Sequence, residues 1–270
     1  FIFQAAEEQI PGGAVRLVRD GVMDGVAAVF GLHSASLLPG GTVSVRAGYT
    51  TANADSFRLE IDGPGGHGSA PAATADVVYL AARVIDAWQG IVSRRVDPML
   101  PAVLTVGKVR AGEANNVIAA HAVLEGTVRT MDPATRVTIE REMGRIAAAL
   151  ADSGAGLGSS ANLHYLRGYP SVHNTEAATE LVRRAALDVV GAERLVAEEP
   201  TMVGEDFSYY QEKAPGCYFS LGGGNADRGI TAPHHSDHFD LDDTASLPVV
   251  VAMMGTVDLR ALAGLPGSAT

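Results

Sequence analysis

The feature that most constrains the fold is a series of six segments between residues 56 and 168 whose hydrophobic period alternates between two and 3.6. The β-rich segments are 56–62, 102–109, 121–130 and 161–167, and the helical segments are 74–93 and a stretch that starts at Asp132-Pro133. Strand, helix, strand, strand, helix, strand is the ferredoxin-like order. We therefore expect a self-contained four-stranded unit with two helices in the middle of the chain.

Both helices of this unit have a recognisable start and one apolar stripe. We expect Thr74 to cap the first helix, and Asp132 followed by Pro133 to start the second. The stripes are Val77, Leu80, Ala81, Val84, Trp88 and Ile91 in the first helix, and Ile139, Met143, Ile146, Ala147 and Leu150 in the second. Each stripe recurs at helical spacing and predicts a face buried against the sheet.

The flanking segments alternate strands and helices, which favours an α/β layer with a largely parallel sheet. We expect a helix at about 12–20, a helix capped at Asn174 that runs to Val190 and is ended by Gly191, a strand at 217–222 and a final helix from about Asp243. The predicted fold class is an α/β domain, residues 1–53 and 169–270, split by the inserted ferredoxin-like domain at 54–168. The apolar run Phe1–Phe3 predicts that the chain opens inside a strand, as a piece of a longer protein would.

Composition excludes several classes of function. Twenty basic residues against thirty-one acidic ones give a net charge of −11, and no Lys/Arg-rich run is present, which argues against a nucleic-acid or anionic-membrane partner. No uninterrupted apolar stretch approaches the roughly 18 residues of a membrane span. The single cysteine, Cys217, excludes an internal disulfide framework and fits a reducing compartment, so we expect a cytoplasmic protein. Cys217 itself is interpreted as a strand residue.

Carboxylates and imidazoles lie at the ends of apolar runs, where ligands gather in open α/β sheets. Glu7 and Glu8 follow the first run, and His33 closes the run 27–32. His234, His235 and His238 lie together in a later polar loop, with aspartates nearby at 237, 240, 242 and 243 that are candidate acceptors for ring N–H groups. One carboxylate to hold an ion and another to handle a proton is what a metal-assisted hydrolase needs. Taken alone, two adjacent glutamates are usually a solvated acidic pair, and a lone histidine after a strand is more often a satisfied one. Adjacent glutamates reach one site only if the backbone turns there.

Three glycines precede His67 in the loop 63–71, which lets the backbone turn sharply or approach a ligand. Asn116 is compatible with a simple hairpin turn, or with an amide presented to an oxyanion or a substrate carboxylate. The stretch 204–210 mixes acids and aromatics, as the lining of a pocket or the start of a helix would.

Taken in order, these stretches resemble the M20 metallopeptidases, in particular the branch of hippurate hydrolases, N-acyl-L-amino acid amidohydrolases and indole-acetyl (IAA)-amino acid hydrolases. The matching motifs are Phe-Gln-Ala-Ala-Glu-Glu (3–8), Phe-Gly-Leu-His (30–33), Gly-Gly-His-Gly-Ser-Ala-Pro (65–71), Asn-Val-Ile (116–118), Leu-Glu-Gly-Thr-Val-Arg-Thr (124–130), Gly-Glu-Asp-Phe-Ser-Tyr-Tyr (204–210) and Pro-His-His-Ser (233–236). The resemblance implies a catalytic α/β domain split by a lid domain that usually dimerises.

The resemblance also implies roles. Glu7 matches the general base and acid, Glu8 and His33 match metal ligands, and His235 matches the ligand of a Pro-Leu-His-Ser motif, where this chain has His234 in place of the leucine. The choice between His234 and His235 therefore rests on register. In the lid, His67 matches the histidine that steadies the tetrahedral intermediate of a neighbouring subunit, and Asn116 matches a polar residue near the substrate.

The implied activity is hydrolysis of N-acyl amino acids with two divalent ions, which for nitrogen and oxygen ligands means zinc, manganese, cobalt or nickel. The implied partners are a small-molecule substrate and a second copy, in a homodimer formed through the lid. Further family ligands belong to Asp and His-x-Cys-Gly-His-Asp stretches that this chain lacks, so we expect Glu8, His33 and His235 to hold one ion at most and the chain alone to be inactive. The alternatives are a non-catalytic dimerisation or binding module, and a dipeptidase or deacetylase of the same fold.

Overall fold

The computed structural model describes residues 1–153 and 157–264 of the chain. The chain divides into two compact units, which are described separately here. Unit 1 comprises residues 1–51, 172–201 and 206–270, and unit 2 comprises residues 52–171 and 202–205.

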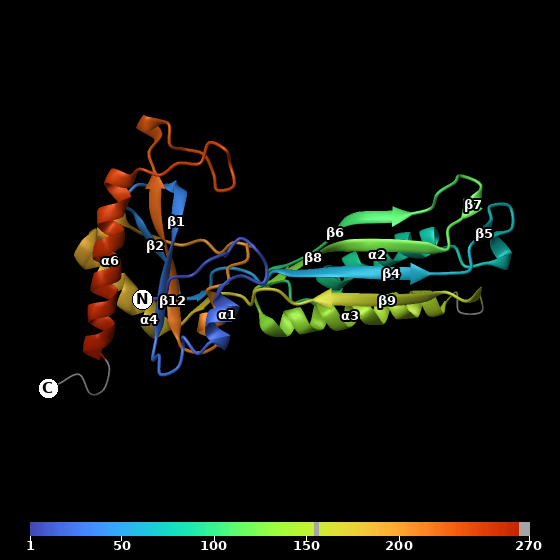
Figure 1. The fold of residues 1–270 in the computed structure, drawn as a ribbon, viewed down its shortest axis with the longest axis horizontal. Coiled ribbons are helices and arrows are strands. Elements are labelled where there is room, and N and C mark those ends of the chain that lie inside the picture. Colours follow the sequence, from blue (N-terminus) through green and yellow to red (C-terminus); the bar gives the residue numbers. More distant parts are fainter. Residues whose placement is uncertain (154–156, 265–270) are drawn as a thin grey trace. The chain divides into compact units, whose positions relative to one another are not determined.

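Unit 2 has the ferredoxin-like order expected from the sequence. Its main elements are β4 (Asp55–Asp62), α2 (Val77–Arg95), β6 (Ala102–Ala111), β8 (His121–Thr130), α3 (Pro133–Asp152) and β9 (Ser160–Leu166). The four strands form an antiparallel sheet in the order β6-β8-β4-β9 (Figure 1). A 3-10 turn, η1 (Pro71–Ala73), and two short strands, β5 (Gly66–His67) and β7 (Val117–Ile118), complete the unit.

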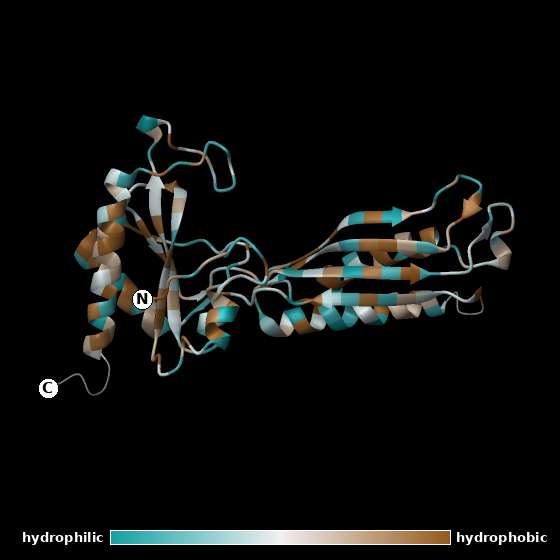
Figure 2. Ribbon diagram, viewed as in Figure 1, coloured by the Kyte–Doolittle hydropathy of each residue, from teal (hydrophilic) through white to brown (hydrophobic). Residues whose placement is uncertain are grey.

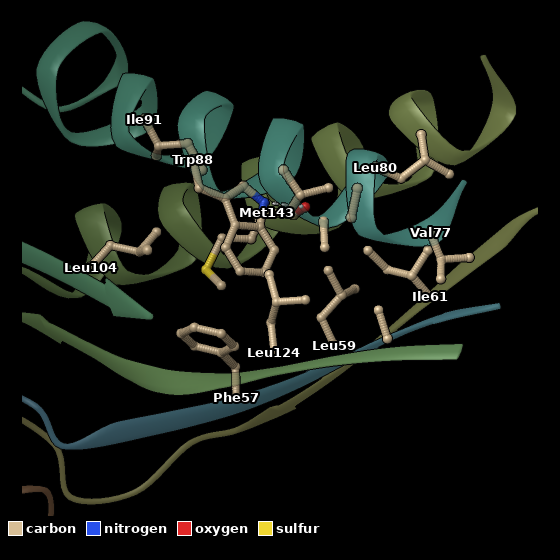
Figure 3. Close-up of a cluster of buried hydrophobic side chains, with 14 of the residues drawn as sticks. Phe57, Leu59, Ile61, Val77, Leu80, Trp88, Ile91, Leu104, Leu124 and Met143 are labelled. Atoms are coloured by element: carbon tan, nitrogen blue, oxygen red, sulfur yellow. Dashed lines mark hydrogen bonds between the residues drawn. The ribbon is translucent and has the colours of Figure 1, made fainter. Parts of the chain in front are cut away.

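The core of unit 2 lies between one face of the sheet and the two helices. Along β4, buried residues alternate with more exposed ones. Hydrophobic and hydrophilic positions alternate in the same way (Figure 2), so that one side of the strand is apolar. The expected α2 stripe is buried along its whole length, and Trp88 at its centre is fully buried (Figure 3). The indole Nε1 donates to the Met143 carbonyl of α3 at 3.1 Å, and the Phe57 ring meets the indole edge-on at 5.1 Å. Burial of these aromatic and aliphatic side chains holds sheet and helices together.

Of the two helix caps predicted for unit 2, one is confirmed and the other is wrong. Asp132 caps α3 as predicted, and its carboxylate accepts from the Thr135 backbone N–H at 2.7 Å. The prediction for α2 was wrong, because Asp76 and not Thr74 accepts from the first free N–H groups. The Thr74 hydroxyl instead donates to the Gly65 carbonyl at 2.8 Å and fixes the glycine-rich loop.

Unit 1 is built on a mixed sheet in the order β1-β12-β2-β11. Its strands are β1 (Val29–Pro39), β2 (Val43–Val45), β11 (Leu195–Ala197) and β12 (Gly216–Gly224), and the antiparallel pair β3 (Gly48–Tyr49) and β10 (His173–Asn174) forms a separate ladder. Its helices are α1 (Ala14–Arg19), α4 (Glu176–Val189), α5 (Ser208–Gln211) and α6 (Asp243–Gly264), with 3-10 turns η3 (Ala192–Arg194) and η4 (Ala226–Arg228). Two of the three strand pairings in the main sheet are parallel, as expected.

Side chains alternate along β12 and divide unit 1 into two cores. Cys217, Phe219 and Leu221 pack with α4 and α6, whereas Tyr218 belongs to the cluster around Ala14 of α1. The helices α4 and α6 therefore cover one face of the sheet, and α1 packs on the other (Figure 1).

Two local predictions in unit 1 were wrong. Residues 1–6 form no strand, since no described segment pairs with them. Asn174 precedes α4 without capping it, because its side chain is engaged elsewhere. It donates to the Arg46 and Tyr218 carbonyls at 2.9 and 2.7 Å and accepts from the Tyr218 N–H.

Helix α6 differs from the expectation that no stretch of the chain approaches the length of a membrane span. Within the described ranges it is the one helix that is long and apolar enough to cross a bilayer, with a mean hydropathy of 1.5 over its best window. Its inner side nevertheless packs in the core with α4 and β12, and Met253 and Val257 are fully buried there. A single helix of this kind is weak support for a membrane span, and the expectation of no membrane partner stays a prediction.

Candidate functional site

The segment that carries Glu7 and Glu8 turns at these two residues. Both glutamates lie in a turn, and the preceding Ala6 has a φ of 60°, in the left-handed region that residues with a Cβ seldom adopt. A turn at this point meets the condition under which adjacent glutamates can act at one site. Glu7 is half-buried and Glu8 is exposed.

Asp206 anchors this segment from the other end of the chain. Its buried carboxylate accepts from the Gln4 amide at 2.8 Å and from the Ala14 N–H at 3.1 Å, and the Tyr210 hydroxyl donates to Gln4 Oε1 at 2.6 Å. The carboxylate oxygens of Asp206 and Glu7 come within 4.8 Å of one another. The sequence allowed the stretch 204–210 either to line a pocket or to start a helix. The structure favours the first interpretation for Asp206, because its side chain does not cap α5.

His33 lies in the middle of β1 and not at its end, because the strand continues beside β12 to Pro39. Its Nδ1 lies 2.6 Å from the Ser34 carbonyl oxygen, and a carbonyl oxygen only accepts, so Nδ1 carries the proton. The Nε2 atom of neutral His33 then has a free lone pair, which is the arrangement usual for an imidazole that binds a metal.

The structure pairs the remaining candidates. His235 Nε2 lies 3.9 Å from Glu8 Oε2, with both side chains about three-quarters exposed. The ring of His234 lies 4.8 Å from that of His33, measured between centroids. Within the described part of the chain, no cluster of three potential ligands within 4.8 Å includes a histidine. The candidate residues thus lie in two pairs, one formed by Glu8 and His235 and the other by the two remaining histidines.

Electrostatics distinguish His234 from its neighbours. Burial lowers the pKa of His234, the charge of His33 lowers it further, and the Ser34 backbone and the charge of Glu8 act in the opposite direction. The neutral imidazole is therefore favoured. His235, by contrast, has a φ of 61°, a backbone conformation that is costly for a residue with a side chain and that clusters at functional sites.

The histidine loop is held by Asp242, at the start of α6. Asn225 and Arg228 both donate to its carboxylate, Asn225 at 2.5 Å and Arg228 at 2.8 Å, and these contacts hold the pKa of Asp242 below its usual value. Asp242 was expected as an acceptor for a histidine ring, and this was wrong, since its oxygens are engaged by the loop itself. Asp237 lies 3.6 Å from His238 Nε2 in an exposed pair.

In unit 2, the two candidate lid residues lie side by side on the short ladder of β5 and β7. His67 pairs with Val117, and the Gly68 N–H donates to the Asn116 carbonyl at 2.8 Å. A Cβ on Gly68 would lie 2.8 Å from that carbonyl oxygen, so the approach requires glycine. A simple hairpin turn was one of the two interpretations of Asn116. The structure adds a short strand, β7, directly after this residue, which the sequence did not reveal.

The hydrogen bonds of His67 fix its tautomer. Its Nδ1 accepts from the Ser69 backbone N–H at 3.1 Å and lies 2.7 Å from the Ser69 hydroxyl. A backbone N–H only donates, so neutral His67 carries its proton on Nε2. The exposed ring thus presents a hydrogen-bond donor, as an oxyanion requires.

Cys217 takes no part in the site. It is fully buried in β12, and burial raises the pKa of its thiol to about 12. A thiol that stays protonated at neutral pH is a poor nucleophile, which confirms the interpretation of Cys217 as a strand residue.

Several known proteins are similar to this chain over most of its length. The chain is 37% identical over 254 residues to Probable hydrolase sll0100 of Synechocystis sp., covering 94% of the chain and 64% of the relative. It is 37% identical over 249 residues to N-acetylcysteine deacetylase of Bacillus subtilis, covering 91% of the chain and 62% of that enzyme. The crystal structure of Bacillus subtilis YXEP, a dinuclear metal binding peptidase from the M20 family, superposes with a TM-score of 0.77 at 31% identity, covering 97% of the chain and 64% of that protein.

The chain thus spans slightly less than two thirds of the length of the proteins it matches. The family model of peptidase family M20/M25/M40 matches residues 1–257, nearly the whole sequence. The chain belongs to peptidase family M20/M25/M40.

Proposed function

We propose that the protein hydrolyses the amide bond of N-acyl amino acids with the help of divalent metal ions. The observation that carries the proposal is the pairing of Glu8 with His235 next to a backbone turn that also presents Glu7. The similarity to a deacetylase and to a dinuclear metal binding peptidase supports the same reaction class.

The residues present fit metal ions. His33 has its Nδ1 proton engaged and its Nε2 lone pair free, and the Glu8 carboxylate faces an imidazole nitrogen. We propose that Glu8, His33 and His235 hold the metal, with zinc, manganese, cobalt or nickel all compatible with such ligands. Bound divalent ions would polarise the scissile carbonyl and lower the pKa of a water molecule.

Glu7 is the proposed proton carrier. It takes a proton from the attacking water and returns it to the leaving nitrogen, so that an acid and a free amino acid leave the site. Glu7 is half-buried at the turn, whereas Glu8 is exposed and lies beside His235.

His67 and Asn116 are the proposed oxyanion donors. The Nε2–H of His67 and the side-chain amide of Asn116 come from one short ladder and can donate to one developing negative charge. We also propose that unit 2 mediates a homodimer, which matches the exposed edge strand β6.

The test is a turnover screen with N-acetyl, N-benzoyl and N-indoleacetyl amino acids and with dipeptides. It is run on the 270-residue chain and on the longest protein that its gene encodes, each loaded in turn with zinc, manganese, cobalt and nickel. Release of free amino acid from an N-acyl substrate is expected. Preference for dipeptides would move the function to the dipeptidase alternative, and no turnover with any metal in either form would favour the non-catalytic one.

A further inference from the structure

The histidine at position 234 has a buried ring nitrogen without a hydrogen-bond partner in the part of the chain that the structure describes. This atom is Nε2 of His234. Buried polar atoms in folded proteins are nearly always paired, and an exception calls for an explanation in terms of strain, function or a bound group.

The surroundings of His234 indicate which kind of group would satisfy this atom. The ring lies between two others, with the His33 and Phe239 centroids each 4.8 Å away. His33 donates its Nδ1 proton to the Ser34 carbonyl at 2.6 Å, so Nε2 of neutral His33 keeps its lone pair. The ring with this free lone pair is thus the direct neighbour of the ring whose Nε2 has no partner among the described residues.

Two neighbouring imidazoles whose Nε2 atoms can each offer a lone pair suit a transition-metal ion. A metal–nitrogen bond is about 2.0–2.1 Å long, so two rings in edge contact can reach one ion after small rotations. The Ser34 carbonyl, which accepts the Nδ1 proton of His33, plays the part that an outer hydrogen-bond acceptor plays for metal-binding histidines. Entry of the ion requires movement of Phe239, whose side chain is 39% exposed.

We propose that His234 is a metal ligand in addition to His235, and that it binds the ion held by His33. The chain carries histidines at both positions 234 and 235, and the proposal assigns a metal to each. The assignment rests on the proposed function only in taking His33 as a ligand. It makes the site richer in nitrogen and favours nickel and zinc over manganese.

The experiment measures metal binding without substrate. Cobalt and zinc affinities are measured by calorimetry and by cobalt absorption for the unaltered chain, for His234→Leu and for the control His238→Leu, which removes an exposed histidine of the same loop. We expect His234→Leu to lower the affinity at least about tenfold and to weaken the cobalt absorption. The control should behave like the unaltered chain.

A second measurement separates ligation from folding. In an NMR spectrum of the ¹⁵N-labelled imidazoles, zinc should shift Nε2 of His33 and of His234 together, with Nδ1 of both still protonated. Thermal unfolding of the metal-free variants shows whether His234→Leu is folded. A folded His234→Leu chain with unchanged affinity, or a zinc-loaded spectrum in which His234 Nε2 does not shift, would overturn the assignment. Either result leaves the turnover screen unaffected, so the proposed function is judged separately.

Discussion

Glu198 is a buried carboxyl whose replacement should stabilise the protein in a pH-dependent way. It follows β11, and one of its oxygens accepts from the Ser220 hydroxyl, while Oε2 is buried without a partner among the described residues. Burial raises the pKa of Glu198 from 4.5 to about 7, and the Ser220 hydrogen bond and the charge of Arg46 offset only part of this effect. The folded protein therefore keeps a proton on Glu198 that the unfolded chain loses near its ordinary pKa.

The sign of the effect follows from this difference. The folded state binds more protons at Glu198 than the unfolded state does between about pH 4.5 and pH 7. The contribution of Glu198 to the free energy of unfolding is therefore fully present below pH 4.5 and is lost as the pH rises through 7. A pKa shift of this size corresponds to about 3 kcal/mol in the free energy of unfolding, at about 1.4 kcal/mol per pKa unit. Above pH 7 the ionised, buried carboxylate lowers the free energy of unfolding by about that amount.

The substitution Glu198→Gln removes the charge and keeps an oxygen that can accept from Ser220. We expect the variant to exceed the unaltered chain in free energy of unfolding by about 2–3 kcal/mol at pH 8.5, and by less than about 0.5 kcal/mol at pH 4.5. Urea unfolding at both pH values measures the difference. Glu199→Gln, an exposed neighbour, is the control and should change stability by less than about 0.5 kcal/mol at either pH. The reasoning fails if the gain for Glu198→Gln is the same at both pH values or if the variant is less stable at pH 8.5.

Three further predictions concern unit 2. Asp55→Asn should cost about 3–5 kcal/mol in urea unfolding, because it leaves the guanidinium of Arg136 unpaired in a buried network, and the double variant with Arg136→Met should cost less than the sum of the single changes. Trp88→Phe should cost about 1–3 kcal/mol by the same measurement, and a cost near zero would show that the buried indole hydrogen bond is not needed. Gly68→Ala should displace Asn116 and lower kcat of the metal-loaded enzyme at unchanged metal content, and an unchanged kcat would contradict the role proposed for this ladder.

Local periodicity was enough to predict the two long helices and the four main strands of unit 2, but not the short strands β5 and β7. The stripe from Val77 to Ile91 and the Asp132 cap depend on residues a few positions apart, and the structure reproduces both. Thr74 was misassigned because its hydroxyl is claimed by Gly65, a contact that no local pattern reveals. The length of β1 beyond His33 is likewise decided by its partner β12, which lies far along the chain.

The candidate site was predictable in its residues and less so in its geometry. Glu7, Glu8, His33 and His235 were identified from motifs, and their pairing became visible only in the structure. Gln4 and Asp206 are 202 positions apart, and their hydrogen bond fixes the segment that carries the glutamates. Such a long-range contact leaves no trace in periodicity. Sequence register also left the choice between His234 and His235 open, whereas the structure gives each a partner of its own.

The most direct test of the account compares Glu7→Gln with Glu8→Gln in the longest protein that the gene encodes. Bound metal is determined by elemental analysis and turnover by release of free amino acid from the best N-acyl substrate of the screen. The account predicts that Glu7→Gln keeps the full metal content and loses turnover, whereas Glu8→Gln loses metal as well as turnover. Metal loss on Glu7→Gln with full metal content in Glu8→Gln would contradict the assignment of proton transfer to Glu7 and metal binding to Glu8.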